Sequence, residues 1–290
     1  MGLCDDVRES CAAVAESARH VSIELDRVDR IEAGPEPELN PERHYLEGSG
    51  EDVAMFTLTL DTINFGSGWF PTLRKRPGCS GYNTIAWALT DRFRAEGPWT
   101  AGQLRELDQR TVAEALGQDA DHELMALYAQ ALRQLGEFLG ERKALDVVAE
   151  AGGSAERLAE QLAAGMSLYD DPGFYKRAQI VPADLALAGV AEFHDLDRLT
   201  IFADNLVPHV LRVDGVLSYT PELAAHIDGE KLLQSRAQER EVRACAVHAC
   251  EHIAATLGVP ARTLDNWLWN RGQQPRYKAV PRHRTRTTAY

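Results

Sequence analysis

The sequence predicts a mainly α protein, a single globular helical domain over residues 1–290 with few or no short strands. Three observations carry this prediction. Apolar residues recur at helical spacing in most segments between the glycine- and proline-rich breaks. No alternation of strands and helices typical of a parallel sheet is evident. The composition, 44% hydrophobic and 26% charged, is that of a globular protein, and 290 residues suffice for one large domain or two small ones.

The N-terminal part is expected to contain two helices separated by a loop. Residues 5–21 carry apolar side chains at helical spacing, and residues 31–50 are rich in Pro, Glu and Gly, so residues 1–50 form an N-terminal helix and loop. Residues 53–65 fit either a strand or a helix, and we favour a helix because the run is long for a strand. Residues 66–81 hold four glycines and two prolines, which predicts a loop.

The middle of the chain reads as a succession of helices. One is expected at 82–93, and Thr100 is a candidate N-cap for a helix that runs through Leu116. Three more are expected at 123–139, at 141–151 and from Ser154 to 168.

The C-terminal part continues in the same way. A helix is expected at 178–190, with a kink or a late start because Pro182 lies inside it. A short apolar segment is expected at 199–213, and a helix is expected to start at Thr220 and Pro221. A last short helix is expected at 263–270. The longest helix, 239–257, should turn these residues inward: Val242, Cys245, Ala249, His252 and Ile253.

Charge is distributed unevenly along the chain. The net charge of −13 disfavours a protein that binds a long phosphate backbone, yet residues 271–290 carry six Lys or Arg and no acid. This basic tail is either disordered or docked onto the body, and its aromatic and apolar residues, among them Tyr277 and Tyr290, favour docking. The five cysteines are odd in number and form no C-x-x-C pair, which favours reduced thiols. With an acidic N-terminus and no apolar run of about 20 residues, a soluble cytoplasmic protein is expected.

Several ionisable residues lie inside apolar runs, where a charge is expensive to bury unless it is paired or part of a site. Asp204 follows Ile201-Phe202-Ala203, and Lys176 and Arg177 lie between Phe174-Tyr175 and Ile180-Val181. Such a carboxylate is either paired within the core, a helix cap, or a catalytic group. The two cations are either an ordinary surface pair or contacts for an anion.

Other polar residues admit both a structural and a functional interpretation. Asp61 and Asn64 converge if their segment is helical, and could hold polar edges of a base or sugar, or simply cap a helix. Asp184 follows Lys176 by eight residues, on roughly the same helical face, and either binds ligand or pairs with a lysine. Glu241 either orders a site from another helix or belongs to a solvated face.

A histidine- and cysteine-containing stretch near the C-terminus resembles a metal site but is interpreted otherwise. Cys245, His248 and His252 share one helix face, whereas a tetrahedral metal site takes ligands from more than one segment. With Cys250 they are read as core residues and one histidine at a polar edge. We expect neither a metal nor a cofactor.

Two blocks of sequence resemble a known family. They are Phe174-Tyr175-Lys176-Arg177-Ala178-Gln179-Ile180-Val181-Pro182-Ala183-Asp184 and the segment from Thr200 to His209, which contains Phe202-Ala203-Asp204-Asn205. Both resemble the signature segments of the queuosine salvage protein family. Further segments agree in order: Leu60-Asp61-Thr62-Ile63-Asn64-Phe65, Ser80-Gly81-Tyr82, Glu241-Val242-Arg243, Leu268-Trp269 and His283-Arg284-Thr285-Arg286. The chain departs from the family pattern at Asn205-Leu206, where Tyr-Arg is usual, and at Gly66-Ser67-Gly68-Trp69.

The resemblance implies an N-glycosylase that hydrolyses queuosine 5'-phosphate to queuine and ribose 5-phosphate, with a DNA-glycosylase-like helical fold as one form it could take. It implies catalytic roles for Asp204 and Lys176. It also implies substrate-binding roles for ten residues: Asp61, Asn64, Phe65, Tyr82, Arg177, Asp184, Phe202, Asn205, Glu241 and His209.

The expected partner is this small molecule, without intact nucleic acid or membrane, and the sequence sets no oligomeric state. The alternative is a non-catalytic binding module for modified nucleosides or tRNA, in which the basic residues would matter more than Asp204.

Overall fold

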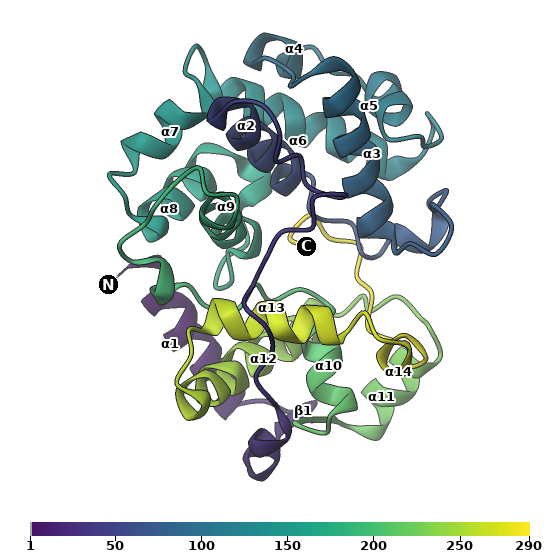
Figure 1. Cartoon of the computed structure of the whole chain (residues 1–290). Helices are drawn as coiled ribbons and strands as arrows, with labels where there is room; N and C mark the ends of the chain where they lie inside the picture. The colour runs from purple at the N-terminus through teal and green to yellow at the C-terminus, as the bar shows by residue number, and fades with distance from the viewer. Residues whose placement is uncertain (1) are drawn as a thin grey trace. The chain divides into compact units, whose positions relative to one another are not determined.

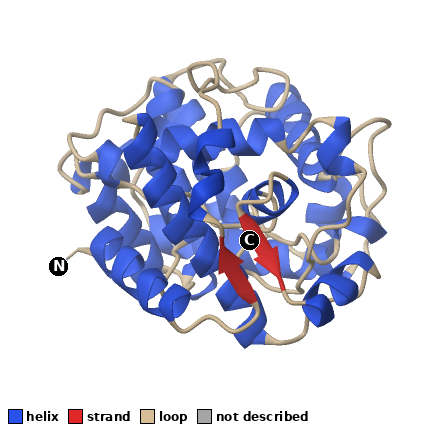
Figure 2. Ribbon diagram, turned by 90° about the horizontal axis from the view of Figure 1, so that it is seen from below, coloured by secondary structure: helices blue, strands red, loops and turns tan. Residues whose placement is uncertain are grey.

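The computed structural model describes residues 2–290, apart from the side chains of residues 29 and 30. Across these residues it contains fourteen α-helices and a single two-stranded sheet, so the mainly α prediction is confirmed. The strands β1 (Val21–Ile23) and β2 (Leu217–Tyr219) pair antiparallel, with Val21 opposite Tyr219 (Figure 2). No helix in the described part is both long and apolar enough to cross a bilayer.

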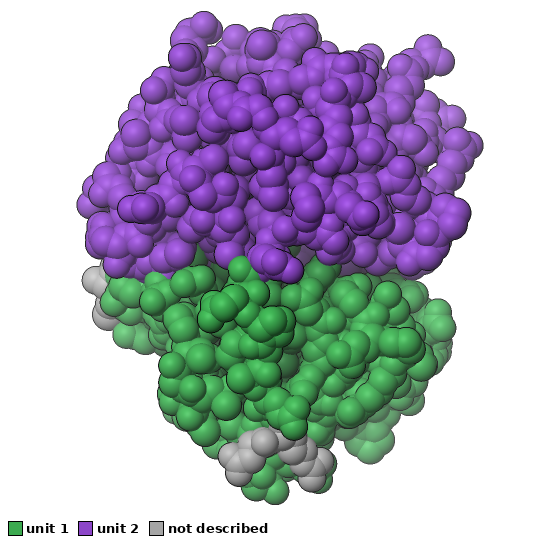
Figure 3. All heavy atoms as spheres, in the orientation of Figure 1, with its two compact units in different colours: residues 1–37, 172–176, 197–286 green, residues 38–171, 177–196, 287–290 purple. Residues whose placement is uncertain are grey.

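The chain divides into two compact units, coloured separately in Figure 3. Unit 1 comprises residues 1–37, 172–176 and 197–286, and unit 2 comprises residues 38–171, 177–196 and 287–290. The single domain over residues 1–290 and its DNA-glycosylase-like arrangement stay predictions.

Unit 1 is built around one long helix, α12 (Arg236–Leu257), which packs along α1 (Leu3–Glu16) (Figure 1). The shorter helices of this unit are α10 (Val207–Val213), α11 (Pro221–Asp228), α13 (Ala261–Arg271) and α14 (Pro275–Lys278). α11 begins at Thr220 and Pro221 as predicted, and the Thr220 hydroxyl caps it by accepting the Leu223 N–H at 3.5 Å.

The expected helix over residues 5–21 is wrong at its end. α1 stops at Glu16, and Val21 belongs to β1. The backbone N–H groups of Arg19, His20 and Val21 all donate to Oε1 of Glu241 on α12. These N–H groups are therefore not available to carbonyls of a preceding helical turn, and the chain leaves the helix.

The expected inward face of α12 is correct except at one position. Val242, Cys245, Ala249 and Ile253 are buried, whereas His252 is exposed. His252 lies about 100° around the helix from Ile253, which moves it off the buried stripe.

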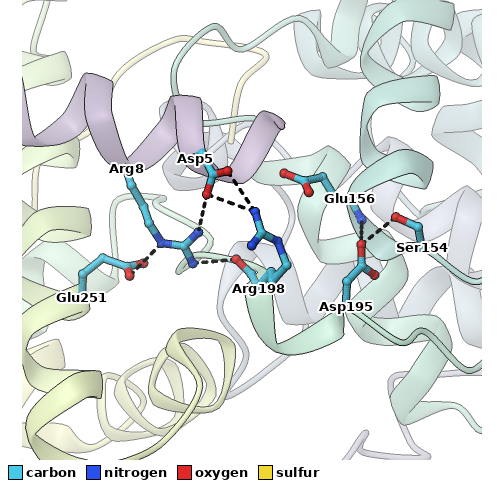
Figure 4. A network of polar contacts seen from close by, with 7 residues as sticks. All are labelled: Asp5, Arg8, Ser154, Glu156, Asp195, Arg198 and Glu251. Carbon is cyan, nitrogen blue, oxygen red and sulfur yellow. Dashed lines mark hydrogen bonds and ion pairs between the residues drawn. The ribbon is translucent and has the colours of Figure 1, made fainter. Parts of the chain in front are cut away.

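A charge network fixes the start of α1 within unit 1. Arg198 donates to both carboxylate oxygens of Asp5 at 3.0 Å (Figure 4). One turn on, Arg8 donates to Glu251 at 2.9 Å and to the Arg198 carbonyl oxygen at 2.6 Å. Asp5 also lies in the first turn of α1, where a negative charge is favourable.

Unit 2 gathers around α6 (Glu123–Leu139), whose bounds are those predicted. α2 (Gly50–Thr62), α4 (Ala101–Arg105) and α5 (Gln109–Ala115) pack against it. The remaining α-helices of unit 2 are α3 (Gly81–Glu96), α7 (Ala144–Glu150), α8 (Ala155–Gly165) and α9 (Lys176–Leu187), whose first residue is counted with unit 1. Over both units, the described residues also form four 3-10 helices, at Leu25–Arg30, Phe70–Thr72, Ser167–Tyr169 and Leu196–Arg198.

The ambiguous segment 53–65 is helical, as favoured. Every residue of α2 from Val53 to Thr62 is buried. A helix that is buried on all sides shows no clear apolar stripe, which explains why its sequence pattern fitted two structures.

Two expectations for unit 2 are corrected. Thr100 caps a helix as predicted, but the helix ends at Arg105, and Asp108 caps a second one by accepting the Thr111 N–H at 2.7 Å. α9 starts at Lys176, before the predicted residue 178, so the late start expected from Pro182 is wrong. Pro182 lies inside the helix. A proline there costs one hydrogen bond, to the carbonyl of Ala178, which this helix tolerates.

The N-terminus of α8 is capped by a carboxylate from outside the helix. Asp195 accepts the Ser154 hydroxyl at 2.6 Å and the backbone N–H of Glu156 at 3.4 Å (Figure 4). It also accepts the Ala155 N–H at 2.6 Å. Partial burial raises the pKa of Asp195, but these hydrogen bonds outweigh it and lower the pKa overall.

We expect Asp195→Ala to lower the free energy of unfolding by about 1–2 kcal/mol, the usual loss for a helix cap. Because the folded-state pKa is depressed, this stability is present at neutral pH and is lost as the pH falls through the folded pKa. Urea unfolding at pH 7 and at pH 3 measures it, with the exposed Glu192→Ala as control. An Asp195→Ala effect equal to that of the control would contradict the assignment.

Candidate active site

The segment from Phe202 to Asn205 in unit 1 is held at every residue. The Phe202 N–H donates to Asp265 Oδ1 at 2.8 Å, and the Ala203 carbonyl oxygen accepts from Arg243 Nε at 2.8 Å. Asn205 Nδ2 donates to the His283 carbonyl oxygen at 3.0 Å. A backbone fixed in this way presents its side chains in one orientation, as a catalytic segment requires.

The Asp204 carboxylate is itself oriented by the helix that follows. Its Oδ1 accepts the N–H groups of Leu206 and Val207 at 2.6 and 3.1 Å, at the start of α10. Within the described residues, Oδ2 makes no hydrogen bond. The capping contacts therefore occupy one oxygen of a half-buried carboxylate and leave the other for a ligand.

A second carboxylate, Asp265 on α13, lies close enough for its charge to interact with that of Asp204. Asp265 is 6% exposed. Burial and then the Asp204 charge raise the pKa of Asp265 to about 7, although the Phe202 N–H and the Lys176 charge act in the opposite direction. A buried carboxyl group with a raised pKa beside a second carboxylate is typical of acid–base sites.

Lys176, the first residue of α9, is buried at 4% exposure and contributes a positive charge near Asp265. The residue before it, Tyr175, has a φ of 49°, in the left-handed region. This conformation costs a non-glycine residue on the order of 1 kcal/mol or more. The surrounding structure thus holds the backbone of Tyr175, directly before Lys176, in an unfavourable state, a feature that clusters at functional sites.

The basic tail brings Arg282 near the same carboxylate. Burial lowers the pKa of Arg282, and the Asp204 charge opposes this effect. Leu233 N–H donates to the Arg284 carbonyl oxygen at 2.8 Å, and Tyr277 donates to Asp214 at 2.9 Å, so the tail contacts unit 1 on both sides of Arg282. The last residues, 287–290, are counted with unit 2, where Gly66 N–H donates to the Tyr290 carbonyl oxygen at 2.9 Å.

Unit 2 holds a polar group of its own. Asn64 Nδ2 donates to Asp61 Oδ1 at 3.4 Å, so the expected convergence of these two residues is confirmed. Burial and then the charges of Asp184 and Asp61 raise the pKa of Tyr82, while the Arg43 charge lowers it. Both carboxylates therefore lie within electrostatic reach of the Tyr82 hydroxyl.

Arg177 contacts two buried aromatic rings and a helix C-terminus, which are structural contacts. It is 2% exposed, and its guanidinium lies 4.7 Å from the ring centre of Phe65 and 4.6 Å from that of Tyr169. Its Nη1 donates to the Thr62 carbonyl oxygen at 2.6 Å, at the end of α2. A cation there stabilises the C-terminus of a helix that also carries the buried Asp61.

Three further predicted substrate-binding residues also make structural contacts. Phe65 is 1% exposed and packs edge-on against Tyr128, with ring centres 5.0 Å apart. His209 is 2% exposed and its Nε2 lies 2.9 Å from the Tyr277 carbonyl oxygen. Glu241 is buried and holds residues 19–21, which rules out the alternative of a solvated face.

The histidines and cysteines of α12 separate into two faces. Cys245 and Cys250 are buried, and burial raises the pKa of both thiols. His248 and His252 lie outside with their Nε2 atoms 3.3 Å apart. The residues described here contain no group of three or more ligands suited to a metal ion.

Sequence reasoning missed Asp265 and Arg282. Asp265 lies between Leu264 and the run Trp267-Leu268-Trp269, so the argument applied to Asp204, a carboxylate within an apolar segment, would have found it. Arg282 gave no such signal, because it is one of six basic residues in the tail.

Comparison with known proteins identifies the family of this chain. The family model described as queuosine salvage protein matches residues 43–290. A queuosine 5'-phosphate N-glycosylase/hydrolase of Sphaerobacter thermophilus is 32% identical over 308 residues, which cover 96% of this chain and 95% of that protein. Proteins with the same name from Mus musculus and Dictyostelium discoideum are 28% and 27% identical, with 98% of each chain covered. The chain belongs to the queuosine salvage protein family.

Proposed function

We propose that the protein is an N-glycosylase that hydrolyses queuosine 5'-phosphate, with Asp204 as its principal catalytic residue. The reaction breaks the bond between C1′ of the ribose and the base nitrogen. Water supplies the hydroxyl group to C1′ and the proton to the departing base, which gives ribose 5-phosphate and queuine. The observation that carries this proposal is the oriented Asp204 carboxylate, whose second oxygen makes no hydrogen bond within the described chain.

The chemistry of the substrate requires the enzyme to stabilise the sugar rather than to activate the base. Queuine has carbon where guanine has N7, so protonation at that position cannot help the base to leave. Positive charge therefore builds on the ribose ring, and a carboxylate beside C1′ stabilises it or attacks it. Asp204 fits either role.

Asp265 and Lys176 support this carboxylate in different ways. Asp265 holds the backbone at Phe202 and, with a pKa of about 7, is largely neutral below that pH. A neutral Asp265 leaves the negative charge concentrated on Asp204, where the developing cation needs it. Lys176 offsets the charge of Asp265 when that group ionises.

The cyclopentene-diol arm of queuine carries a secondary amine that is cationic at neutral pH. Within unit 2, Asp61 and Asp184 keep their predicted role as carboxylates for a cationic group, with Asn64 and Tyr82 as neutral polar groups beside them. We leave Arg177, Phe65, His209 and Glu241 out of the substrate-binding set, because their contacts hold backbone or core. Phe202 and Asn205 are assigned to positioning of the Asp204 segment.

We expect action on the mononucleotide and not on intact tRNA. A net charge of −13 disfavours a long polyanion, and guanosine 5'-phosphate should react poorly because groups meant for the cationic arm would stay unpaired. The test incubates the protein with queuosine-containing tRNA, followed by digestion and nucleoside analysis, beside queuosine 5'-phosphate and guanosine 5'-phosphate. Loss of queuosine from tRNA at a rate matching the mononucleotide would overturn this reading.

The alternative is a binding module for modified nucleosides or tRNA that performs no chemistry. The relatives' names favour hydrolysis, and so does the pair of coupled carboxylates in unit 1, because a module that only binds has no need of a buried carboxyl group with a raised pKa.

A further inference from the structure

Arg282, in the basic tail, has surroundings that resemble those of a residue in a ligand site. It is only partly exposed, and burial lowers its pKa. Its guanidinium makes no hydrogen bond and no ion pair within the described residues. A guanidinium has five N–H donors, and taking it out of water without partners is costly unless an anion completes the site.

Arg282 lies close enough to Asp204 for their charges to interact. The two charges interact, yet the side chains form no ion pair, so the carboxylate does not satisfy the guanidinium. His283, beside it, is 2% exposed. Burial and then the positive charges of Arg243, His209 and Arg282 lower the pKa of His283 to about 3, which identifies a locally positive environment.

The tail is anchored so that Arg282 has a defined place. The carbonyl oxygen of His283 accepts from Asn205, the residue after Asp204, at 3.0 Å. The carbonyl oxygen of Arg284 accepts the Leu233 N–H at 2.8 Å, and Thr285 donates to the Leu233 carbonyl oxygen at 3.2 Å. Consecutive residues after Arg282 are therefore held by unit 1, one of them by the catalytic segment itself.

We propose that Arg282 binds the phosphomonoester of the substrate and thereby holds the ribose against Asp204. This inference rests on the proposed function and assigns the phosphate contact to Arg282 rather than to Lys176, which lies near Asp265. A phosphate dianion accepts two parallel N–H hydrogen bonds from one guanidinium, and it supplies the negatively charged partner for Arg282. Because Asp204 and Arg282 attract each other without pairing, a ribose 5-phosphate group could contact both at its two ends.

The test compares kcat/KM for queuosine 5'-phosphate with that for the nucleoside queuosine. Wild type should prefer the nucleotide, and Arg282→Gln should reduce the ratio about ten- to a hundredfold, the usual effect of a charge-assisted contact. Arg282→Lys should recover part of the preference. Arg284→Gln is the matched control, because Arg284 lies two residues on and is already paired with Glu230 at 3.6 Å. It should leave the ratio unaltered.

A binding measurement separates this inference from the proposed function. Calorimetric titration with ribose 5-phosphate and with ribose should show tighter binding of the phosphorylated sugar to wild type, and Arg282→Gln should lose that difference. If wild type releases queuine but Arg282→Gln keeps the full nucleotide preference, the Arg282 assignment is refuted and the function stands. If wild type releases no queuine, the proposed function fails, and the titration alone decides whether Arg282 is an anion site.

Discussion

Asp204→Asn is expected to lower the turnover of queuosine 5'-phosphate by at least two orders of magnitude. The amide keeps the shape of the side chain, and its oxygen can still accept the N–H groups of Leu206 and Val207. Only the negative charge is removed, and with it about 3 kcal/mol of electrostatic stabilisation of the sugar cation. Substrate binding should largely survive, so the loss should appear in kcat rather than in the affinity measured by titration.

Single-turnover measurement of free queuine gives the rate, and Asp214→Asn is the control. Asp214 is also buried in unit 1, but its carboxylate is satisfied by Arg276 and Tyr277. Its substitution should affect stability more than chemistry. Near-normal base release by Asp204→Asn would remove the residue from the catalytic role and leave it as the cap of α10.

Asp265→Asn is expected to change how stability depends on pH. The folded-state pKa of Asp265 is raised to about 7, well above its value in an unfolded chain. Its contribution to stability is therefore fully present below the unfolded pKa and is lost as the pH rises through 7. Between pH 5 and pH 8, wild type should lose on the order of 3 kcal/mol more unfolding free energy than Asp265→Asn.

Urea unfolding at the two pH values measures this difference. The asparagine can still accept the Phe202 N–H, so the variant tests the charge and not the hydrogen bond. Asp204→Asn should reduce the same pH dependence in part, because the Asp204 charge contributes to the raised pKa. Identical pH dependence in wild type and Asp265→Asn would show that Asp265 is ionised throughout.

Local signals in the sequence predicted the helices well. Thr100 was identified as a cap because a hydroxyl before a helical run satisfies an N–H group nearby in sequence, and Pro221 marked the start of α11. The end of α1 was not predictable in this way. It depends on Glu241, which lies more than two hundred residues along the chain and accepts from Arg19, His20 and Val21.

The candidate site was predictable only in part, for the same reason. Asp204 and Lys176 became candidates because each interrupts an apolar run, and the family resemblance supplied their predicted catalytic roles. The interactions of Asp204 with Asp265 and Arg282 arise only when three distant segments meet in unit 1, and no local pattern encodes them. Arg177 showed the opposite case, a charge in an apolar run whose contacts, the rings of Phe65 and Tyr169, are structural.

The central claim is that this chain hydrolyses queuosine 5'-phosphate through Asp204. The most direct measurement mixes purified wild-type protein and Asp204→Asn separately with queuosine 5'-phosphate and follows free queuine and ribose 5-phosphate by chromatography. We predict equimolar release of both products by wild type and a rate at least a hundredfold lower for the variant. Binding of the nucleotide by both proteins without release of queuine by either would contradict the claim and favour a binding module.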